Sequence, residues 1–197
     1  MTSTPTLRDH ARGAVRDEVA RQAWLLFSRQ GFEATTVDQI AAAAGMSRRT
    51  FFRYFTGKDE LVLARLVESG ESVVHALRAR PEDEPIWASL RRAFDEGVLQ
   101  QEAHADVARP LLVMLRTEPG VRGTVVEWRR RWQEILEPVV AERLPGRRRG
   151  GSPDVRAAAI VASALSCLET AQDAWVDHPR SRLSTLLDQA MAAVTTG

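Results

Sequence analysis

Residues 35–58, with the sequence TTVDQIAAAAGMSRRTFFRYFTGK, predict two short helices joined by a tight turn. Thr36 is placed to cap the first helix, and Gln39 three residues later completes a capping box. Gly45 suits the left-handed backbone that follows a helix, and Ser47 is placed to cap the second helix. The chain is therefore expected to reverse its direction within a few residues.

The second of these helices, expected over residues 48–55, carries cations and no acid. Phe51 and Phe55 lie four residues apart, so they are expected to pack inward on one side of the helix. No acidic residue occurs between positions 46 and 58. A narrow helix with guanidinium groups near its N-terminus is what readout of the DNA major groove requires, and the alternative is an exposed basic helix without a partner. The remaining surface of the helix carries Arg48, Arg49, Thr50, Phe52, Arg53 and Tyr54.

A wider pattern runs through residues 15–65, from Val19, Ala23, Leu26 and Phe27 through Gly31-Phe32, Thr35-Thr36 and Ala44-Gly45 to Tyr54-Phe55 and Lys58. In this pattern the chain resembles the DNA-binding head of the tetracycline-repressor (TetR) family of bacterial regulators. The resemblance implies a DNA-binding regulator, with repression as the default and activation as an alternative. Residues 49–55, RTFFRYF, resemble a subgroup that includes mycofactocin-associated regulators, for which acyl-thioester effectors would be suitable. The positions that carry the family resemblance are Val19, Ala23, Leu26, Phe27, Gly31, Phe32, Thr35, Thr36, Ile40, Ala41, Ala44, Gly45, Ser47, Thr50, Phe51, Phe52, Tyr54, Phe55 and Lys58.

The resemblance also implies roles for individual residues. Thr36 and Lys58 are implied to bind phosphates of the DNA backbone. Arg48, Arg49 and Thr50 are implied to face base edges or the backbone. The complete set of residues expected at the DNA is Thr36, Ser47, Arg48, Arg49, Thr50, Phe52, Arg53, Tyr54 and Lys58.

One position departs from the family. The family commonly has a tyrosine whose hydroxyl binds a phosphate where this chain has Phe52, and a phenylalanine cannot make that bond. Tyr54 or Arg53 could take over the contact, or Phe52 could meet a thymine methyl group through apolar contact. The role of Phe52 is left open between these alternatives.

The composition is that of a helical protein of the reducing cytoplasm. The chain has 197 residues and a net charge of +1, so the cationic cluster at 46–58 is a local feature. The single Cys167 cannot form an intrachain disulfide and is expected to be a small apolar residue rather than a redox sensor. No segment resembles a signal peptide or a membrane span, so no membrane partner is expected.

The length accommodates a head of about sixty residues and a second unit of ordinary domain size. We expect a helix-turn-helix domain over residues 1–60, in which residues 1–14 form a flexible arm. A helical effector-binding and dimerisation domain is expected over residues 61–197. The arm carries Arg8 and Arg12, which either lie along the DNA or are simply solvated.

Apolar residues recur with helical spacing along the rest of the chain and strand alternation does not, so an all-α fold of about nine helices is predicted. Residues 86–101 are expected to form one helix and residues 104–116 another. A long helix from about residue 121 is expected to be interrupted or kinked at Pro138. Residues 145–153, PGRRRGGSP, form a loop by composition.

For the C-terminal domain, the resemblance implies that the last two helices pair with their copies in a second subunit. It also implies that the central helices enclose a pocket for a small, largely apolar effector. Packing within one chain would explain the same side chains. The candidate residues of the dimer interface are Ala158, Ala162, Leu165, Leu183, Leu187 and Val194. The candidate residues of the pocket are Trp87, Phe94, Met114, Trp128, Trp132, Leu165 and Trp175.

An enzyme is the main competing class of protein, and the sequence contains few features that support it. His10, His75, His104 and His178 are scattered, and no Gly-x-Ser-x-Gly elbow or Cys/His metal grouping occurs. No catalytic residue, cofactor or metal is therefore expected. A further alternative keeps DNA binding but makes the C-terminal domain only a dimerisation or protein-docking module.

Overall fold

The part of the chain that the structure describes is entirely helical. This computed structural model describes residues 6–146 and 154–195, without the side chains of residues 7–10. The all-α prediction is confirmed. The helices are α1 (Leu7–Gln30), α2 (Val37–Ala43), α3 (Arg48–Tyr54), α4 (Lys58–Arg78), α5 (Ile86–Ala93), α6 (Asp95–Ala103), α7 (Ala105–Thr117), the short 3-10 helix η1 (Pro119–Val121), α8 (Arg122–Arg143), α9 (Val155–Asp177) and α10 (Leu183–Thr195).

The beginning of the chain differs from the expectation of an arm. Helix α1 begins at Leu7, so the prediction of a flexible arm over residues 1–14 is wrong for residues 7–14. Residues 1–5 lie outside the described part. The sequence-based start was placed too late because the apolar stripe that marks the helix begins only at Val15, whereas the helix itself extends beyond that stripe.

Two helices of the body also differ from their predictions. The segment 86–101 is divided at Phe94 into α5 and α6, which brings the number of described α-helices to ten. Helix α8 continues through Pro138, so of the predicted interruption or kink the interruption is wrong. Val139 and Val140, just beyond this proline, are buried in the core, and their packing favours continuation of the helix.

The head, formed by α1, α2 and α3, has the local structure that its sequence predicts. The Thr36 side chain accepts a hydrogen bond from the Gln39 backbone, and the Gln39 side chain accepts one in return. Gly45 has a φ of +68°, the left-handed conformation expected after a helix. Ser47 accepts a bond from the backbone N–H of Thr50 and so caps α3. These interactions set the turn between α2 and α3.

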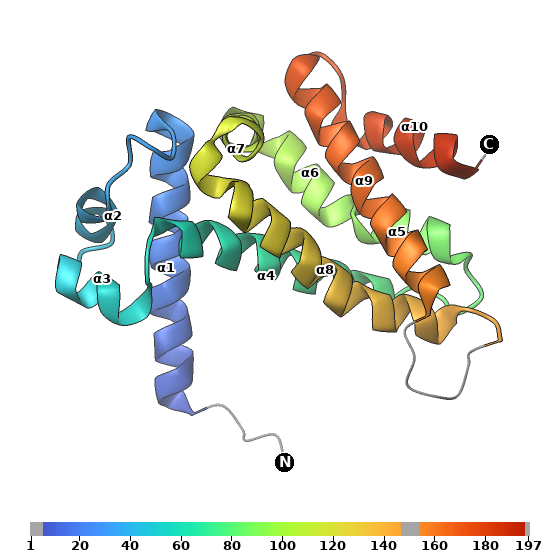
Figure 1. Cartoon of the computed structure of the whole chain (residues 1–197), viewed down its shortest axis with the longest axis horizontal. Helices are drawn as coiled ribbons and strands as arrows, with labels where there is room; N and C mark the ends of the chain where they lie inside the picture. The colour runs from blue at the N-terminus through green and yellow to red at the C-terminus, as the bar shows by residue number, and fades with distance from the viewer. Residues whose placement is uncertain (1–5, 147–153, 196–197) are drawn as a thin grey trace.

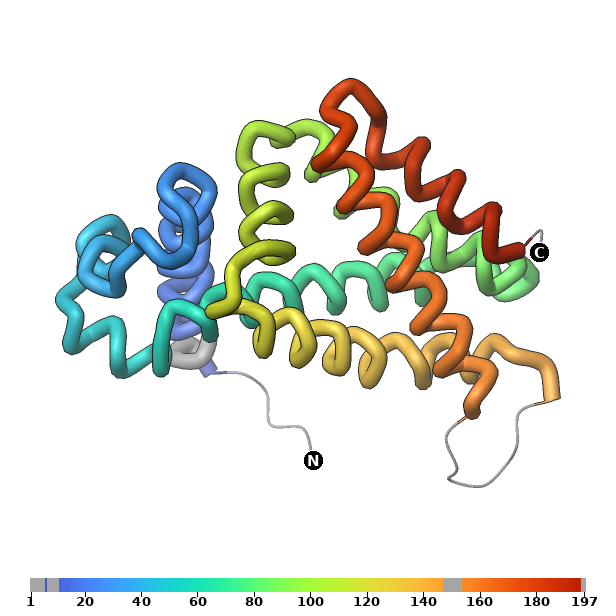
Figure 2. The backbone as a smooth tube through the Cα atoms, turned by 45° about the horizontal axis from the view of Figure 1, so that its top comes forward, coloured from blue at the N-terminus to red at the C-terminus, as the bar shows by residue number. Residues whose placement is uncertain are grey.

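Helix α4 leads from the head along the body, where it packs against α8 (Figures 1 and 2). The indole N–H of Trp132 in α8 donates to the Leu66 carbonyl of α4 at 2.7 Å. Gly70 is buried one turn further on, and a Cβ added there would come within 2.5 Å of the Trp132 indole nitrogen. The two helices can therefore approach this closely only because position 70 has no side chain.

The body packs around one large apolar cluster that α4, α5, α6, α8, α9 and α10 share. Helix α7 divides its contacts between head and body, since Leu111 and Met114 join the apolar cluster of the head. Figure 2 shows α7 standing between α1 and the rest of the body. The head is thus connected to the body through α7 as well as through α4.

Candidate nucleic-acid interface

Helix α3 presents a cationic surface because its apolar side is buried in the core of the head. Phe51 and Phe55 are buried, as their spacing predicts, and their rings lie 5.3 Å apart. Arg48, Arg49 and Arg53 are exposed around the rest of the helix. The structure thus brings the arginines predicted for DNA contact together on one outward surface.

Phe52, the position that departs from the family, lies on the same surface. Its side chain is 47% exposed, although an edge-to-face contact with the Phe51 ring supports it at 5.5 Å. The Arg48 guanidinium lies 5.4 Å from the centre of the Phe52 ring. An exposed aromatic ring beside a guanidinium is suited to apolar contact with a base edge rather than to phosphate binding.

Arg48 has a partner that its own helix does not contain. Its Nη1 donates to both carboxylate oxygens of Asp38 in α2, at 2.9 and 3.1 Å. Both side chains are more than half exposed, so the pair contributes at most about 1 kcal/mol and a stronger acceptor can displace it. Asp38 therefore holds Arg48 in the DNA-free protein without blocking its use.

Lys58 takes a different place from the one that the resemblance implies. Its ammonium group donates to the backbone carbonyls of Phe32, Glu33 and Thr35, at 2.6, 3.4 and 3.2 Å. It also lies 4.1 Å from the centre of the Phe32 ring. A lysine has three N–H donors, so these carbonyls leave none for a phosphate. In this structure Lys58 holds the turn between α1 and α2.

Arg16 of α1 is likewise engaged within the protein. Its guanidinium lies 4.4 Å from the centre of the Phe55 ring and donates to the Tyr54 carbonyl and, at 2.9 Å, to the Glu60 carboxylate. Burial favours a higher pKa for Glu60, but hydrogen bonds from Thr56 and Arg16 outweigh burial and hold the pKa below its ordinary value. Arg16 and Glu60 together fasten the end of α3 to the start of α4.

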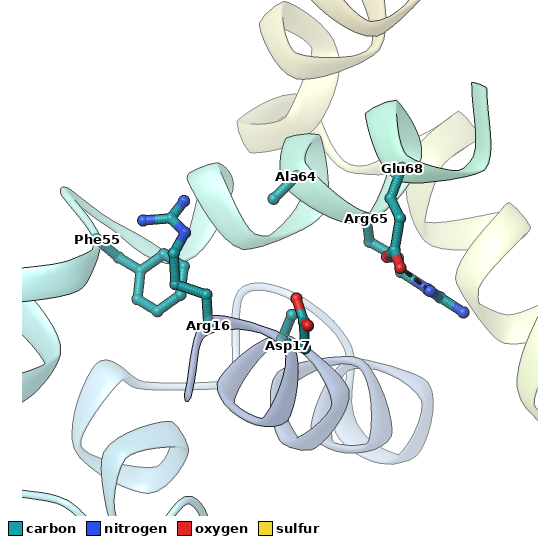
Figure 3. A pocket seen from close by; sticks show the side chains of 7 residues that line it. Arg16, Asp17, Phe55, Ala64, Arg65 and Glu68 are labelled. Atoms are coloured by element: carbon teal, nitrogen blue, oxygen red, sulfur yellow. Dashed lines mark hydrogen bonds and ion pairs between the residues drawn. The ribbon is translucent and has the colours of Figure 1, made fainter. Parts of the chain in front are cut away.

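Figure 3 shows Arg16 and Phe55 at a pocket of about 150 Å³ between α1 and α4. The rest of its lining includes Asp17 and the ion pair of Arg65 with Glu68, whose atoms are 2.7 Å apart. A second hollow, of about 370 Å³, lies between α1 and the turn that joins α2 to α3. Neither pocket is lined by a residue predicted for the effector.

Three exposed arginines of the head remain available. Arg12, Arg49 and Arg53 make no hydrogen bond or ion pair among the described side chains, which leave out those of residues 7–10. Arg53 is next to Tyr54 and lies 5.3 Å from the centre of its ring. Arg12 belongs to α1 and lies 5.8 Å from the same ring. Sequence reasoning left Arg12 unassigned because it placed this residue in an arm.

The residues predicted for the effector pocket are mostly core residues of the body. Phe94, Leu165 and Trp175 are almost completely buried in the apolar cluster. Trp87 is partly buried, and its indole N–H donates to the Met191 carbonyl at 3.1 Å. Met114 is the one member of this set that lies outside the apolar cluster of the body.

Met114 packs with the head instead. Its helix, α7, turns Met114 toward α1, whereas the sequence shows only that the residue lies on the apolar side of a helix.

The tryptophan pair of α8 is the most unusual feature of the body core. The Trp128 and Trp132 rings meet edge to face with 5.4 Å between their centres. The Trp132 N–H is satisfied by Leu66, but the buried Trp128 N–H has no acceptor among the described residues. A buried N–H without a partner is uncommon, because its desolvation is not compensated.

The prediction that Leu165, Leu183 and Leu187 form a dimer interface is wrong. All three are 0% exposed within the single chain and belong to its own core. The periodicity of an amphipathic helix is the same whether its apolar stripe meets its own chain or a partner. Of the remaining candidates, Ala158 and Ala162 are half-buried and Val194 is 53% exposed.

Two features of other classes of protein are absent from the described residues. Within 6–146 and 154–195, no three His, Cys, Asp or Glu side chains are grouped so that they could hold a metal ion. Among the described helices, none combines the length and hydropathy needed to cross a membrane.

Comparisons with known proteins identify the same two regions. The family of bacterial regulatory proteins called tetR matches residues 20–64, and the MftR C-terminal domain matches residues 84–197. The transcriptional regulator TcmR of Streptomyces glaucescens is 34% identical over 145 residues, which cover 71% of this chain and 64% of TcmR. MftR of Mycobacterium tuberculosis, named for mycofactocin biosynthesis, is 27% identical over 181 residues, which cover 87% of this chain and 85% of MftR.

A crystal structure shares the fold. FadR of Thermus thermophilus, a TetR-family repressor in complex with lauroyl-CoA, aligns with a TM-score of 0.60 at 23% identity. The alignment covers 91% of this chain and 93% of FadR.

The helix-turn-helix head and the helical body are thus those of a bacterial transcriptional regulator. The chain belongs to the TetR family, and its C-terminal domain is of the MftR type.

Proposed function

We propose that this regulator is a ligand-responsive repressor, which binds a palindromic operator as a homodimer and releases it when a small, largely apolar effector binds. Its place of action is the cytoplasm, where the operator lies. The observation that carries DNA binding is the outward surface of α3, where Arg49 and Arg53 are exposed and unpaired within the described chain. Such guanidinium groups are suited to guanine edges and phosphates.

The proposed dimer places two heads on one side of the duplex. Helix-turn-helix dimers read half-sites about 34 Å apart, one turn of the DNA helix. Since the buried leucines of α9 and α10 are used within the chain, the partner would lie against the outward faces of these helices. Ala159 and Val155 in α9 and Val194 in α10 are exposed there and small enough for close helix packing.

The effector proposal rests on the body core. The Trp128 N–H is buried without an acceptor, so a ligand that enters between α4 and α8 could supply one. FadR of T. thermophilus is described in complex with lauroyl-CoA, a thioester with a long apolar chain and carbonyl oxygens. We propose an effector of similar chemistry, with an apolar part and at least one hydrogen-bond acceptor.

Release would follow from the position of α4. A ligand between α4 and α8 must separate the contact of Trp132 with Leu66 and Gly70. The first turn of α4 is fastened to the head through Lys58 and Glu60, so a tilt of α4 would move the head as a unit. The coupling between effector and DNA would be about 1–3 kcal/mol, typical of such systems.

The decisive experiment measures binding of both ligands. Fluorescence anisotropy would follow a duplex that covers the DNA upstream of this gene, with and without lauroyl-CoA as the probe. We expect operator binding that lauroyl-CoA weakens, and an equal weakening of lauroyl-CoA binding by the operator, because linkage is reciprocal. Trp128→Phe keeps an aromatic side chain but replaces the indole with a smaller ring that has no N–H, so it should reduce the effect of lauroyl-CoA and spare DNA binding. No binding of the duplex by the wild-type protein would contradict the proposal.

The second candidate function, a body that only dimerises, predicts operator binding that no acyl thioester or fatty acid changes. It is favoured by the nearly complete burial of Phe94, Leu165 and Trp175 in the core of the body, where they already pack against other side chains. A series of acyl-CoA chain lengths in the same assay separates the two functions.

A further inference from the structure

We infer that the operator's backbone phosphates are also bound outside the helix-turn-helix motif, by a site that Arg12 of α1 forms with Arg53 of α3 around the Tyr54 ring. This inference rests on the proposed function and extends its DNA surface to a helix that the motif does not include. Arg12 and Arg53 are 41 positions apart in sequence and belong to different helices, but both lie close to the same aromatic ring.

The geometry of the two guanidinium groups is the first argument. The Arg12 Cζ lies 5.8 Å and the Arg53 Cζ 5.3 Å from the centre of the Tyr54 ring. A tyrosine ring attracts cations through its quadrupole and can hold both groups near each other. Both arginines are exposed, and neither has a hydrogen bond or ion pair within the described residues.

The engagement of the neighbouring charges is the second argument. Arg16, one turn further along α1, is bound to Tyr54 and Glu60. Glu18 in the same helix receives two hydrogen bonds from Arg21 and one from Gln22. Glu60 and Glu18 are therefore already paired, and among the side chains that the structure describes Arg12 and Arg53 have no counter-ion.

Two like charges without a counter-ion repel each other, and an anion between them relieves this repulsion. A phosphate oxygen would also accept charge-assisted hydrogen bonds from both guanidinium groups. Arg12 and Arg53 thus have the charge and the donors that a DNA backbone phosphate requires.

The position of the site along the head is the third argument. Tyr54 is the last residue of α3, the helix proposed to enter the major groove. In Figure 1 the N-terminal part of α1 extends past this end of α3. A phosphate bound by Arg12 and Arg53 would belong to the backbone that borders the groove at the end of the reading helix.

The test is the salt dependence of operator binding by Arg12→Ala. Each lost phosphate contact lowers the slope of log affinity against log salt by about 0.9 for duplex DNA. We expect this decrease for Arg12→Ala, for operator and unrelated duplex alike, and recovery of the wild-type slope in Arg12→Lys.

Arg21→Ala is the matched control, since it removes the same charge from an exposed position of the same helix. Arg21 is nine residues further on, which is about half a turn around the helix axis, and its guanidinium is bound to Glu18. Its slope should equal that of the wild type. Circular dichroism at each salt concentration would establish that both variants remain helical, and Arg12→Gln would replace Arg12→Ala if the latter unfolds.

An unchanged slope in folded Arg12→Ala or Arg12→Gln would overturn the inference. A decrease of equal size in Arg21→Ala would also overturn it, because the effect would then be one of net charge. Failure of the proposed function is a separate result, since it would already be seen as absence of duplex binding by the wild-type protein.

Discussion

The head and the body of this protein use their large side chains in opposite ways. In the head, helices of only seven residues cover a small core, so Phe52 and the cations of α3 face outward. In the body, Trp128, Trp132 and Trp175 all face inward. DNA can therefore meet the head without a change in its packing, whereas an effector must first open the body. The DNA-binding surface of the head is preformed, whereas the packed core of the body must rearrange before an effector can enter.

The largest expected effect tests the packed core of the body. Leu183→Asp with Leu187→Asp places carboxylates in an apolar interior, which destabilises by about 3–5 kcal/mol for an uncompensated buried charge. We expect loss of the helical signal of the body in urea titrations followed by circular dichroism. If the variant were instead a folded monomer, these leucines would belong to a subunit interface and the intrachain core would be incorrect.

Ala159→Glu is the matched change on the exposed side of α9. The residue is exposed within the chain, so the substitution should leave the intrinsic folding of the subunit within about 0.5 kcal/mol. A dimer that uses this face should dissociate, and sedimentation velocity would measure it. A stable dimer of Ala159→Glu would place the interface elsewhere.

The next effect concerns the contact between α4 and α8. Gly70→Ala adds a Cβ 2.5 to 2.8 Å from three atoms of the Trp132 indole, and such overpacking costs about 1–3 kcal/mol. Gly97→Ala is the control, because nothing lies within 4 Å of a Cβ at this helical position. We expect a lower thermal midpoint for Gly70→Ala and a higher one for Gly97→Ala. Equal midpoints would mean that the two helices are not held at this distance.

A smaller effect distinguishes two kinds of cation in the head. Lys58→Met keeps the stem over Phe32 and removes the ammonium group, so the turn between α1 and α2 loses three hydrogen bonds. We expect a loss of about 1 kcal/mol in stability, as for a part-exposed hydrogen-bonded group. The salt slope of DNA binding should stay unchanged. A slope lower by about 0.9 would show that Lys58 contacts a phosphate of the DNA.

The smallest effect is a pH dependence at the junction of α4 and α5. Hydrogen bonds from Arg80 and Ser89 lower the pKa of Glu84 from 4.5 to about 2. Because the folded-state pKa is the lower one, this stabilisation is present above pH 4.5 and is lost as the pH falls toward 2. Glu84→Gln should make the stability between these pH values less dependent on pH, as measured by urea titrations. An unchanged profile would exclude this cluster as a source of acid sensitivity.

The sequence predicts the local structure of the head well because that structure depends on neighbours in the chain. The capping box of Thr36, the turn at Gly45 and the inward packing of Phe51 all follow from spacings of a few residues. Lys58 donates to backbone carbonyls of the turn between α1 and α2, and Arg48 donates to Asp38 of α2, and no helical spacing indicates either contact. Long-range contacts of charged side chains therefore need the structure.

In the body the sequence predicts which residues form the apolar side of each helix but not which helices that side contacts. Leu187 and Met114 both lie on apolar stripes, yet the first faces its own core and the second faces the head. The division at Phe94 also has no local cause in the sequence, since neither proline nor glycine occupies that position. Helix periodicity gives the side of a helix that is buried, and only packing selects the neighbour.

The central claim is that the outward surface of α3 reads DNA. The most direct test measures the affinity of the wild type and of Arg49→Ala for the operator and for each of its single-base variants at one salt concentration. Loss of a bidentate contact to guanine should weaken operator binding by about 1–3 kcal/mol and abolish discrimination at one position of each half-site. Wild-type affinity and discrimination in Arg49→Ala at every position would contradict the account.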